Sequence, residues 1–432
     1  MPFTFHLVIP SPSNEDVLLI DHGNGWALPR VSSPERTVVH AVVAGVKEQL
    51  GLDVLLLRGA LLERGRLDHD GGDVFFLTEN LDDSLPTRGR WFGEDALATG
   101  LIVDDADLAA IRQWFTERGD PKRRMQPWQR EGWYAAAVGW INETLSGVSS
   151  VAQYSTWCAS SLLRVETGEG RFYFKAAPDF FHSEPVVTAT LAEHFPSTIP
   201  RPVAIDEERG WMLLEDFGDA IVGEMAVEHW DGALDALLTI QQASLPILGT
   251  LLTAGCVDRR LEVLAAQIAR FAEGSTDELS HDTLDRLRAA VPRLQELCVD
   301  VAEAKIPATL VHGDFHLDNI VIKDGRHLIF DWTDACIAHP FVDLATFFYG
   351  WGPASTDTEL RRRLRDRYLL GWSDLIPLDE AVHLFERTEP LAAMHHAITY
   401  RRILDALDPS ERVEFTSALS WWVDKALESL PA

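Results

Sequence analysis

The chain has 432 residues, of which 46% are hydrophobic and 14 are Trp, so it is long enough to fold into two or three domains. Asp and Glu number 67 against 38 Lys and Arg, and the formal net charge of −29 argues against nucleic acid and anionic membranes as partners. Four scattered cysteines without a CxxC pair, no leader peptide and no apolar run of about 18 residues predict a cytoplasmic protein with reduced thiols and no membrane span.

Residues 1–118 alternate between strand-like and helical patterns. Strands are predicted at 3–9, 17–20 and 52–57, and an apolar stripe predicts a helix that starts near Ser33 and ends at Gly51. The GWALP segment at 25–29, followed by such a helix, resembles the Nudix fold. An α/β domain is therefore expected here.

The departures from the Nudix box decide what this domain can do. With Gly51 at the closing glycine, Arg30 stands at the first glycine of the box and Arg36 at its first glutamate. Ala44 and Gly45 stand at its Arg-Glu pair. Only Glu48 remains of the metal-binding glutamates. A pyrophosphohydrolase needs several carboxylates to hold magnesium. We therefore expect a degenerate domain that binds or packs rather than hydrolyses, with a homodimer contact as one open role.

Residues 119–150 are expected to be a linker and a lead-in helix. Gly, Pro and basic residues mark the linker up to about residue 127. Apolar and aromatic residues then recur at helical spacing from Trp128 to Leu145.

Residues 151–219 are predicted to form a small sheet with one helix. Strands at 162–165 and 172–174 surround a Gly-containing turn, and Lys175 ends the second strand. Glu184 begins a helix nine residues later. The segment 153–161 lacks glycine but contains Ser155 and Ser160, whose hydroxyls could bind oxygen-rich groups.

From about residue 220 onward, helical periodicity dominates. Helices are predicted at 233–242, 259–271, 283–299, 358–372 and 378–406. Within this part, the stretch 312–348 places Asp314, Asn319 and Asp331 around two short strands joined by a Gly turn. An amide oxygen and a carboxylate are suitable ligands for Mg²⁺ held by phosphates, and Asp314 is left to accept a proton.

This order of motifs resembles the aminoglycoside phosphotransferase and choline kinase family, relatives of the protein kinases. The resemblance rests on HGD at 312–314, Asn319, FDW at 330–332 and DLA at 343–345, and it covers about residues 126–432. It implies that Asp314 is the catalytic base and that Asn319 and Asp331 bind the metal. His312 and Asp343 would support the loop.

The resemblance also assigns the remaining candidates. Lys175 would neutralise the nucleotide phosphates and pair with Glu184, while Ser155 and Ser160 would cover the phosphates. The strand that starts at Trp211 would lead into a hinge that binds the nucleotide base, ATP or GTP. The other candidates are Glu215 and Phe217 in that hinge, and Glu389, His395 and His396 for the acceptor.

The sequence thus predicts an α+β protein: a two-lobed protein-kinase-like phosphotransferase preceded by an α/β Nudix-like domain. The N-lobe would span 151–219 and the helical C-lobe 220–432. The expected function is transfer of the γ-phosphoryl of ATP or GTP, with Mg²⁺, to a hydroxyl of a small molecule, which the acidic charge suggests also carries an amine. A nucleotide-binding pseudokinase or regulatory module is the alternative, and a Nudix-type nucleotide hydrolase is the third reading.

Overall fold

The structure, a computed structural model, describes residues 3–23, 25–33, 39–60, 72–81, 84–99, 104–120, 122–274, 278–349 and 355–431. The chain forms two compact units. The first comprises Met1–Asp179 and Ala406–Val413, and the second comprises Phe180–Asp405 and Glu414–Ala432. Each unit is described by itself.

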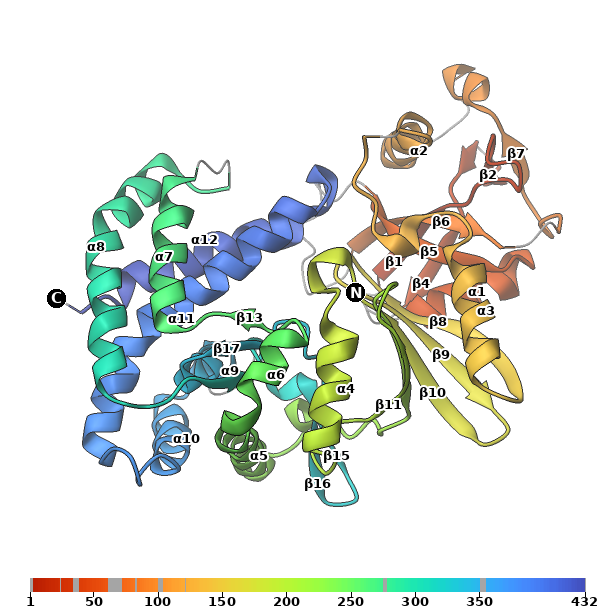
Figure 1. Cartoon of the computed structure of the whole chain (residues 1–432). Helices are drawn as coiled ribbons and strands as arrows, with labels where there is room; N and C mark the ends of the chain where they lie inside the picture. Colours follow the sequence, from red (N-terminus) through yellow and green to blue (C-terminus); the bar gives the residue numbers. More distant parts are fainter. Residues whose placement is uncertain are drawn as a thin grey trace. The chain divides into compact units, whose positions relative to one another are not determined.

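The first unit begins with two small sheets and two helices (Figure 1). Its elements are β1 (Phe3–Val8), β2 (Val17–Asp21), β3 (Trp26–Ala27), β4 (Arg30–Ser33), α1 (Val39–Leu50), β5 (Val54–Ala60), β6 (Gly72–Asn80), β7 (Arg90–Phe92) and α2 (Asp105–Glu117). One sheet has the order β4-β1-β6-β5, with β1 parallel to β6 and antiparallel to β4. The other has the order β3-β2-β7. This part contains both strands and helices, as the sequence predicted. The Nudix resemblance stays a prediction.

Hydrophobic side chains pack on both faces of the larger sheet. Phe5 and Leu7 of β1 belong to one core together with Val42 of α1. Val8, which follows on the same strand, belongs to a second core together with Ile111 of α2. Because successive side chains of a strand point to opposite faces, one short strand helps to bury both helices.

The residues at the Nudix-box positions have structural contacts. Arg30 lies on β4 and contacts Asp104 and Asp107 at 3.0 and 3.2 Å. A Cβ on Gly45 would lie 2.7 Å from a methyl group of Val31, so a glycine is needed where α1 approaches β4 closely. Glu48 is exposed on α1. Arg36 and the predicted helix start at 34 and 35 lie outside the described residues.

The rest of the first unit contains a lead-in and three strands, α3 (Trp133–Thr144), β8 (Val148–Thr156), β9 (Ser161–Thr167) and β10 (Gly170–Ala176). The predicted helix from Trp128 to Leu145 is wrong in its first turn. Pro127–Gln129 form a separate 3₁₀ turn that is capped at Arg130, and Gly132, with φ of 79°, is the N-cap residue of α3. The predicted hairpin is confirmed as the antiparallel pair β9 and β10.

The second unit is mainly helical. Its first half contains α4 (Glu184–His194), β11 (Pro202–Asp206), β12 (Trp211–Glu215), α5 (Trp230–Ala243), α6 (Leu248–Thr253), β13 (Val257–Asp258), α7 (Leu261–Glu273) and α8 (His281–Glu303). Its second half contains β14 (Thr309–Val311), β15 (Ile320–Lys323), β16 (Arg326–Ile329), β17 (Cys336–Ala338), α9 (Asp343–Tyr349), α10 (Thr358–Leu370), α11 (Leu378–Ala406) and α12 (Val413–Glu428). The five predicted helices are confirmed with end shifts of a few residues.

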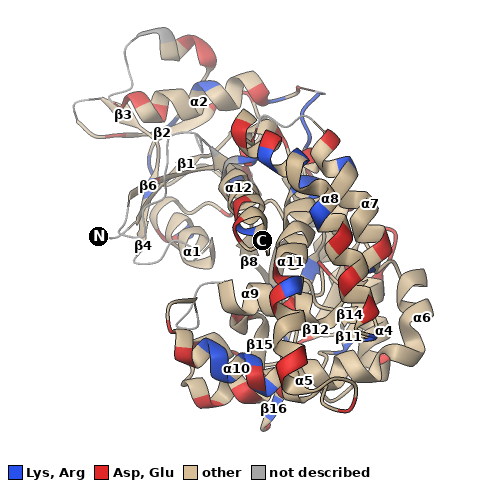
Figure 2. Ribbon diagram, turned by 90° about the vertical axis from the view of Figure 1, so that its left-hand side faces the viewer, with Lys and Arg blue, Asp and Glu red and all other residues tan. Residues whose placement is uncertain are grey.

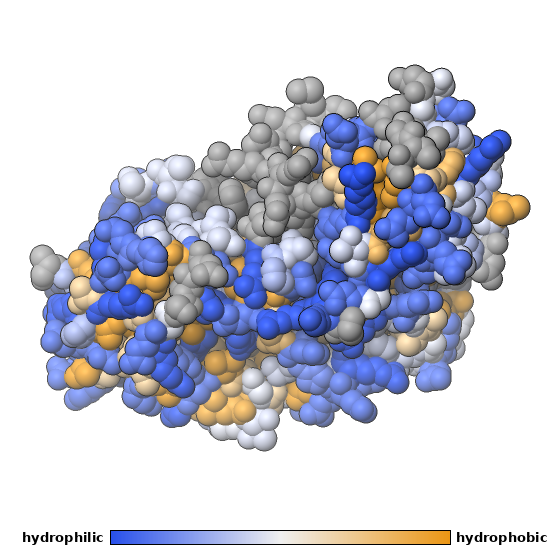
Figure 3. Space-filling model, turned by 90° about the horizontal axis from the view of Figure 1, so that it is seen from above, coloured by the Kyte–Doolittle hydropathy of each residue, from blue (hydrophilic) through white to orange (hydrophobic). Residues whose placement is uncertain are grey.

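Charges of both signs occur along the helical surface, as α10 shows (Figure 2). Arg362 pairs with Glu359 on the same helix at 2.6 Å, and Arg363 pairs with Asp231 of α5 at 2.9 Å. The face seen from above is mostly hydrophilic with hydrophobic residues among them (Figure 3). No single helix in the described part is long and apolar enough to cross a membrane. Two consecutive helical segments with a bend between them, Val227–Ala243 and Leu245–Thr253, reach the necessary length and apolar composition only when taken together.

Candidate active site

The loop that carries Asp314 begins where strand β14 ends. β14 pairs antiparallel with β17 in a three-stranded sheet, which fixes the start of the loop at His312. Gly313 then adopts φ of 84°, and a Cβ at this position would lie 2.3 Å from the carbonyl oxygen of Asp334. Only glycine fits there. Its left-handed conformation makes the turn that leads from His312 to Asp314.

His312 holds the loop from inside. Its side chain is fully buried, its Nε2 donates to the Phe330 carbonyl at 2.9 Å, and its Nδ1 accepts from the Asp314 N–H at 3.3 Å. These roles define a neutral imidazole, and burial lowers the pKa of His312 accordingly. The side chain therefore acts as a positioning residue, which agrees with the support role that the family resemblance implied.

Asp343 holds the loop from the other side. Its two carboxyl oxygens accept from the backbone N–H groups of His312 at 3.1 Å and Gly313 at 2.9 Å, and its Oδ2 also accepts from Gln241 Nε2 at 2.9 Å. Burial raises the pKa of Asp343 to about 7. A buried carboxyl on the first turn of α9 thus fixes the backbone that leads to Asp314.

The hairpin of β15 and β16 brings Asn319 and Asp331 together, as predicted. Ile320 pairs with Ile329, and the Phe330 N–H donates to the Asn319 carbonyl at 3.0 Å, so Asp331 directly follows the residue bonded to Asn319. The Asn319 side chain donates from Nδ2 to the Asp314 carbonyl at 3.1 Å, which leaves its Oδ1 as the atom that a cation could use.

Asp331 adopts a backbone conformation that is unusual for a residue with a side chain. Its φ is 65°, in the left-handed region that Asp tolerates better than most residues. The Thr333 hydroxyl donates to its Oδ1 at 2.9 Å. Held conformations of this kind cluster at functional sites, which fits the position of Asp331 beside Asn319 and Asp314.

His316, which the sequence analysis did not select, lies against Asp314. Its Nε2 is 3.4 Å from Asp314 Oδ2, and 42% of the Asp314 side chain is exposed. Partial burial raises the pKa of Asp314, but the contact with His316 outweighs it and leaves that pKa below its usual value. For His316 burial lowers the pKa, and Asp314 outweighs this and raises it. Asp314 is therefore ionised at neutral pH and able to accept a proton.

Asp334 is a second residue that the sequence analysis missed. Burial, and then the nearby charge of Asp314, raise its pKa to about 7, while Arg402 opposes the shift. Its Oδ1 is buried without a hydrogen-bond partner among the described residues. Asp334 follows the FDW motif by two residues, but nothing in the sequence around it marks it as buried.

The predicted hinge lies against the catalytic hairpin. The ring centroids of Phe217 and Phe330 are 5.1 Å apart, and Lys323 Nζ donates to the Asp216 carbonyl at 2.6 Å. Glu215 is exposed at the end of β12. A nucleotide base held at Phe217 would thus lie next to the segment after β16 that carries Phe330 and Asp331.

The candidates in strands β8 to β10 fall in the first unit. Lys175 is buried on β10, and Ser155 lies on β8, so the predicted covering segment 153–161 is shortened to a turn at 157–160. The Ser160 hydroxyl accepts from Trp157 Nε1 at 2.8 Å within this turn. Glu184 begins α4 and is buried in the second unit, so its pairing with Lys175 stays a prediction.

The three acceptor candidates on α11 differ in their contacts and in their electrostatic surroundings. Burial lowers the pKa of His396 to about 4, although the charge of Asp314 opposes the shift. The His396 ring stacks on Trp422 with centroids 4.3 Å apart. His395 is buried and its pKa lies well below the usual value because of burial. Glu389 accepts a hydrogen bond from the Tyr349 hydroxyl. His396 is therefore the candidate that the charge of Asp314 reaches.

Asn319 and Asp331 fit a metal ion that is also bound by the phosphates of a nucleotide. No group of three His, Cys, Asp or Glu side chains in the described part of the chain could hold an ion alone. One amide and one carboxylate, Asn319 and Asp331, match a Mg²⁺ ion whose other ligands are phosphate oxygens and water. Asn319 and Asp331 as ligands of Mg²⁺ stay a prediction.

Two solved or curated proteins are similar to parts of this chain. The crystal structure of a choline kinase from Streptococcus pneumoniae matches with a TM-score of 0.50 and 15% identity, covering 68% of this chain and 99% of that one. A glucosamine kinase of Streptacidiphilus jiangxiensis is 33% identical over 128 residues, 25% of this chain and 29% of that protein. This chain thus matches less than a third of the length of that curated relative. The structural likeness confirms the predicted kinase-like phosphotransferase fold.

The family itself follows from the sequence model that matches. The model described as the phosphotransferase enzyme family matches residues 159–378, which is just over half of the 432 residues. The match contains β10 with Lys175, strand β12, the loop of Asp314 and the hairpin of β15 and β16. The chain belongs to the phosphotransferase enzyme family.

Proposed function

We propose that this protein is a small-molecule kinase that transfers the γ-phosphoryl of ATP or GTP to a hydroxyl of its acceptor. The observation that carries the proposal is the fixed loop and hairpin, in which Asn319 bonds the backbone of Asp314 and lies beside Asp331. Phosphoryl transfer asks a protein mainly for positioning and charge neutralisation, and these three side chains provide both.

Each residue has one task in the proposed reaction. Bound Mg²⁺ would supply charge neutralisation at the phosphates, with Asn319 and Asp331 as its protein ligands. Asp314 orients the acceptor hydroxyl and takes its proton as the new bond to phosphorus forms, and His316 stabilises the carboxylate before the transfer. His312 and Asp343 keep the loop in place.

We propose further that the acceptor carries an amine as well as a hydroxyl. The net charge of −29 favours cationic substrates. Glucosamine and choline, the substrates in the names of the two similar proteins, each combine a hydroxyl with a cationic nitrogen. Glu389 and Asp334 are carboxyl groups of the second unit that could face such a nitrogen.

A screen of nucleotide consumption with Mg²⁺ tests the proposal. Amino sugars, amino alcohols and aminoglycosides are compared with neutral sugars and nucleosides, with ATP and GTP in parallel. Turnover is expected with an amine-bearing alcohol, and phosphorylation of only neutral or anionic alcohols would contradict the acceptor class. In Asp331→Asn, the removed charge should raise the Mg²⁺ concentration needed for half-maximal turnover. Equal Mg²⁺ dependence in both proteins would remove Asp331 as a ligand.

A further inference from the structure

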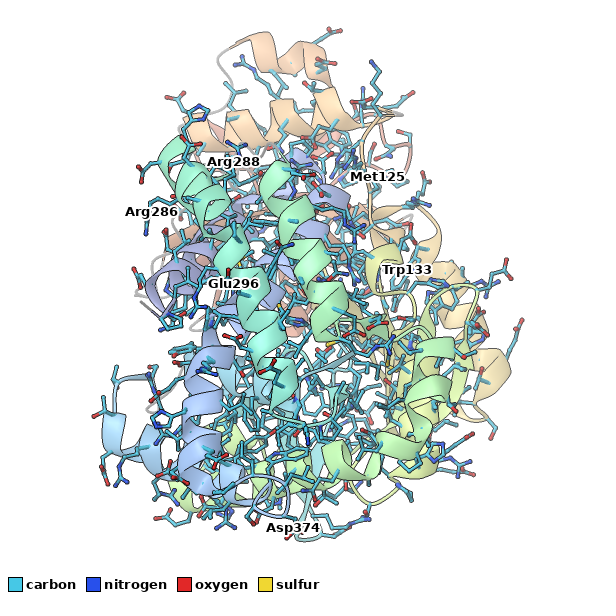
Figure 4. All side chains as sticks on the ribbon, turned by 60° about the vertical axis from the view of Figure 1, so that its left-hand side comes forward. Met125, Trp133, Arg286, Arg288, Glu296 and Asp374 are labelled. Atoms are coloured by element: carbon cyan, nitrogen blue, oxygen red, sulfur yellow. The ribbon has the colours of Figure 1, made fainter. Side chains whose placement is uncertain are left out.

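A cavity of about 260 Å³ lies within the first unit. Its walls come from the loop between β1 and β2, from β5 and β6, from the end of α2, and from residues 118–131 of the linker and lead-in. Met125, labelled in Figure 4, belongs to this lining. No residue of the loop that carries Asp314 takes part, so the cavity is separate from the site described above.

Two arginines meet at one wall of the cavity. Arg58 of β5 is only 4% exposed and contacts the Glu117 carboxylate, and Arg123 Nη1 lies 3.7 Å from the same Glu117 oxygen. Arg123 Nε and Nη2 are buried without a hydrogen-bond partner among the described residues. Burial and the charge of Arg123 lower the pKa of Arg58 to about 9, while the charges of Glu411 and Asp408 oppose the shift. This wall therefore has N–H donors left for an anionic group.

Two carboxylates meet at another wall. Glu79 of β6 accepts from the Gly132 N–H at 3.3 Å through Oε1, while its Oε2 is buried without a hydrogen-bond partner in the described part of the chain. Glu131 also lines the cavity. Burial raises the pKa of Glu79, and the charge of Glu131 adds to the shift. A cationic group at this wall would relieve that repulsion.

The two walls together define the ligand by charge and size. A simple anion would face carboxylates as well as the arginines, namely Glu117 and Asp120 in the lining and Glu411 and Asp408 beside them. A simple cation would face the repulsion of Arg58 and Arg123. A molecule with one positive and one negative group satisfies both walls at once. The volume lies below that of most drug-sized pockets, so the ligand is an amino acid or a small phosphorylated amine rather than a nucleotide.

The cavity walls are bonded to the turn expected to cover the nucleotide phosphates. Leu56, which directly precedes the lining residues Leu57 and Arg58, exchanges two hydrogen bonds with the Gln153 side chain of β8, at 2.8 and 2.7 Å. Gln153 is buried three residues before the end of β8. A shift of β5 would thus move β8 and the turn at 157–160 that follows it.

A second connection runs through the lead-in. Trp128 Nε1 donates to the Trp157 carbonyl in that turn at 3.0 Å, and the neighbouring Gln129 lines the cavity. Both connections begin at residues beside the cavity and end at the same short turn. They provide a route by which a ligand in the cavity could change the position of the turn.

We propose that this cavity is an effector site for a small zwitterion, and that its occupancy changes nucleotide binding through β8. The anionic group binds at Arg58 and Arg123, and the cationic group binds at Glu79 and Glu131. The coupling part of the proposal rests on the proposed function, because it requires a nucleotide at the turn. The binding part does not.

Calorimetric titration of the full chain without nucleotide tests the binding. The probes are phosphoethanolamine and a panel of α-amino acids, with inorganic phosphate, ethanolamine and glucose as comparators. A zwitterion should bind at least about 10-fold more tightly than any comparator, because phosphate and ethanolamine each lack one charged contact and glucose lacks both. Equal or tighter binding of glucose, phosphate or ethanolamine, or no zwitterion binding, would overturn the proposal.

Variants show where the zwitterion binds. Arg123→Gln and Glu79→Gln should each weaken it about 10-fold or more. Arg112→Gln on the exposed side of α2 and Glu169→Gln in the β9–β10 turn are matched controls that should leave it unchanged. If Arg123→Gln does not fold, Glu79→Gln decides the result. Binding that survives both cavity variants lies elsewhere, the acceptor cleft included, and refutes the assignment.

The coupling is measured as the nucleotide Kd with and without saturating zwitterion. We expect a change of about 5-fold or more in the wild type. Gln153→Met keeps the side-chain length but removes both bonds to Leu56, so it should bind the zwitterion normally and lose the change in nucleotide Kd. An unchanged wild-type nucleotide Kd would overturn the effector role. Absence of phosphoryl transfer to any acceptor would instead bear on the proposed function, since neither titration depends on turnover.

Discussion

Replacing Asp343 by Asn should damage the active-site loop without touching a substrate. In the wild type both oxygens of Asp343 accept hydrogen bonds, Oδ1 from Gly313 N and Oδ2 from His312 N and Gln241 Nε2. An amide can keep its oxygen toward His312 and Gln241, but its NH₂ group then faces the Gly313 N–H, which is another donor. The substitution therefore leaves the buried N–H of Gly313 without an acceptor.

The size of the effect follows from this lost bond. A buried donor left unsatisfied costs about 1–3 kcal/mol, and the free energy of unfolding should fall by that amount. The lost bond at Gly313 lies directly before Asp314, so the loop should also lose its geometry. We expect kcat to fall together with the free energy of unfolding.

Urea denaturation and steady-state kinetics measure both effects. They should be done near pH 8, above the pKa of about 7 that burial gives Asp343, so that the wild-type carboxyl is ionised and both oxygens accept. Asp379→Asn is the matched control, because this Asp also lies in the first turn of a helix but is exposed. A change of less than about 0.5 kcal/mol in Asp343→Asn, as expected for the control, would refute the support role.

Three further predictions follow from the same contacts. The pKa of His316 is raised by Asp314, so the stabilising charge pair is present near pH 6 and is lost as the pH rises through that raised value. The stability difference between wild type and His316→Gln should therefore shrink toward pH 9, and a difference that is constant in urea denaturation would contradict this. Burial raises the pKa of Cys256 and Cys298 to about 12, and Cys158 and Cys336 are buried too. A thiol reagent near pH 8 should label none of the four in the native protein and all four in denaturant; rapid native labelling would show that these thiols are accessible. Finally, Glu48 is exposed on α1 and Arg30 is paired with Asp104 and Asp107, so the full chain should not hydrolyse nucleoside diphosphate substrates at high Mg²⁺. Hydrolysis that disappears in Glu48→Gln would show a working site there.

The sequence predicted the parts of the site that depend on local spacing. Asn319 and Asp331 lie on a tight hairpin, so the register of β15 and β16 was enough to bring them together. The support role of Asp343 came from the family resemblance, because its bonds join residues 30 and 31 positions apart.

The missed features depend on tertiary contacts. Nothing in the composition near His316 distinguishes a surface histidine from one that contacts Asp314, and the sequence gives no sign that Asp334 is buried. The predicted start of the helix at Trp128 is wrong because the left-handed conformation of Gly132 interrupts the helix, although the apolar periodicity continues across it. The cavity of the first unit could not be predicted because it depends on tertiary contacts: Arg58, Glu79 and Arg123 come from separate elements.

The most direct test of the central claim is the behaviour of Asp314→Asn. Asp314 accepts a proton in this account and does not bind the metal, so the variant should keep nearly wild-type nucleotide affinity while phosphoryl transfer falls by about 10²-fold or more. Both quantities are measured on the same preparation, with the acceptor that the screen identifies. Unchanged transfer would remove Asp314 from the mechanism, and lost nucleotide binding would make it a ligand instead of the base.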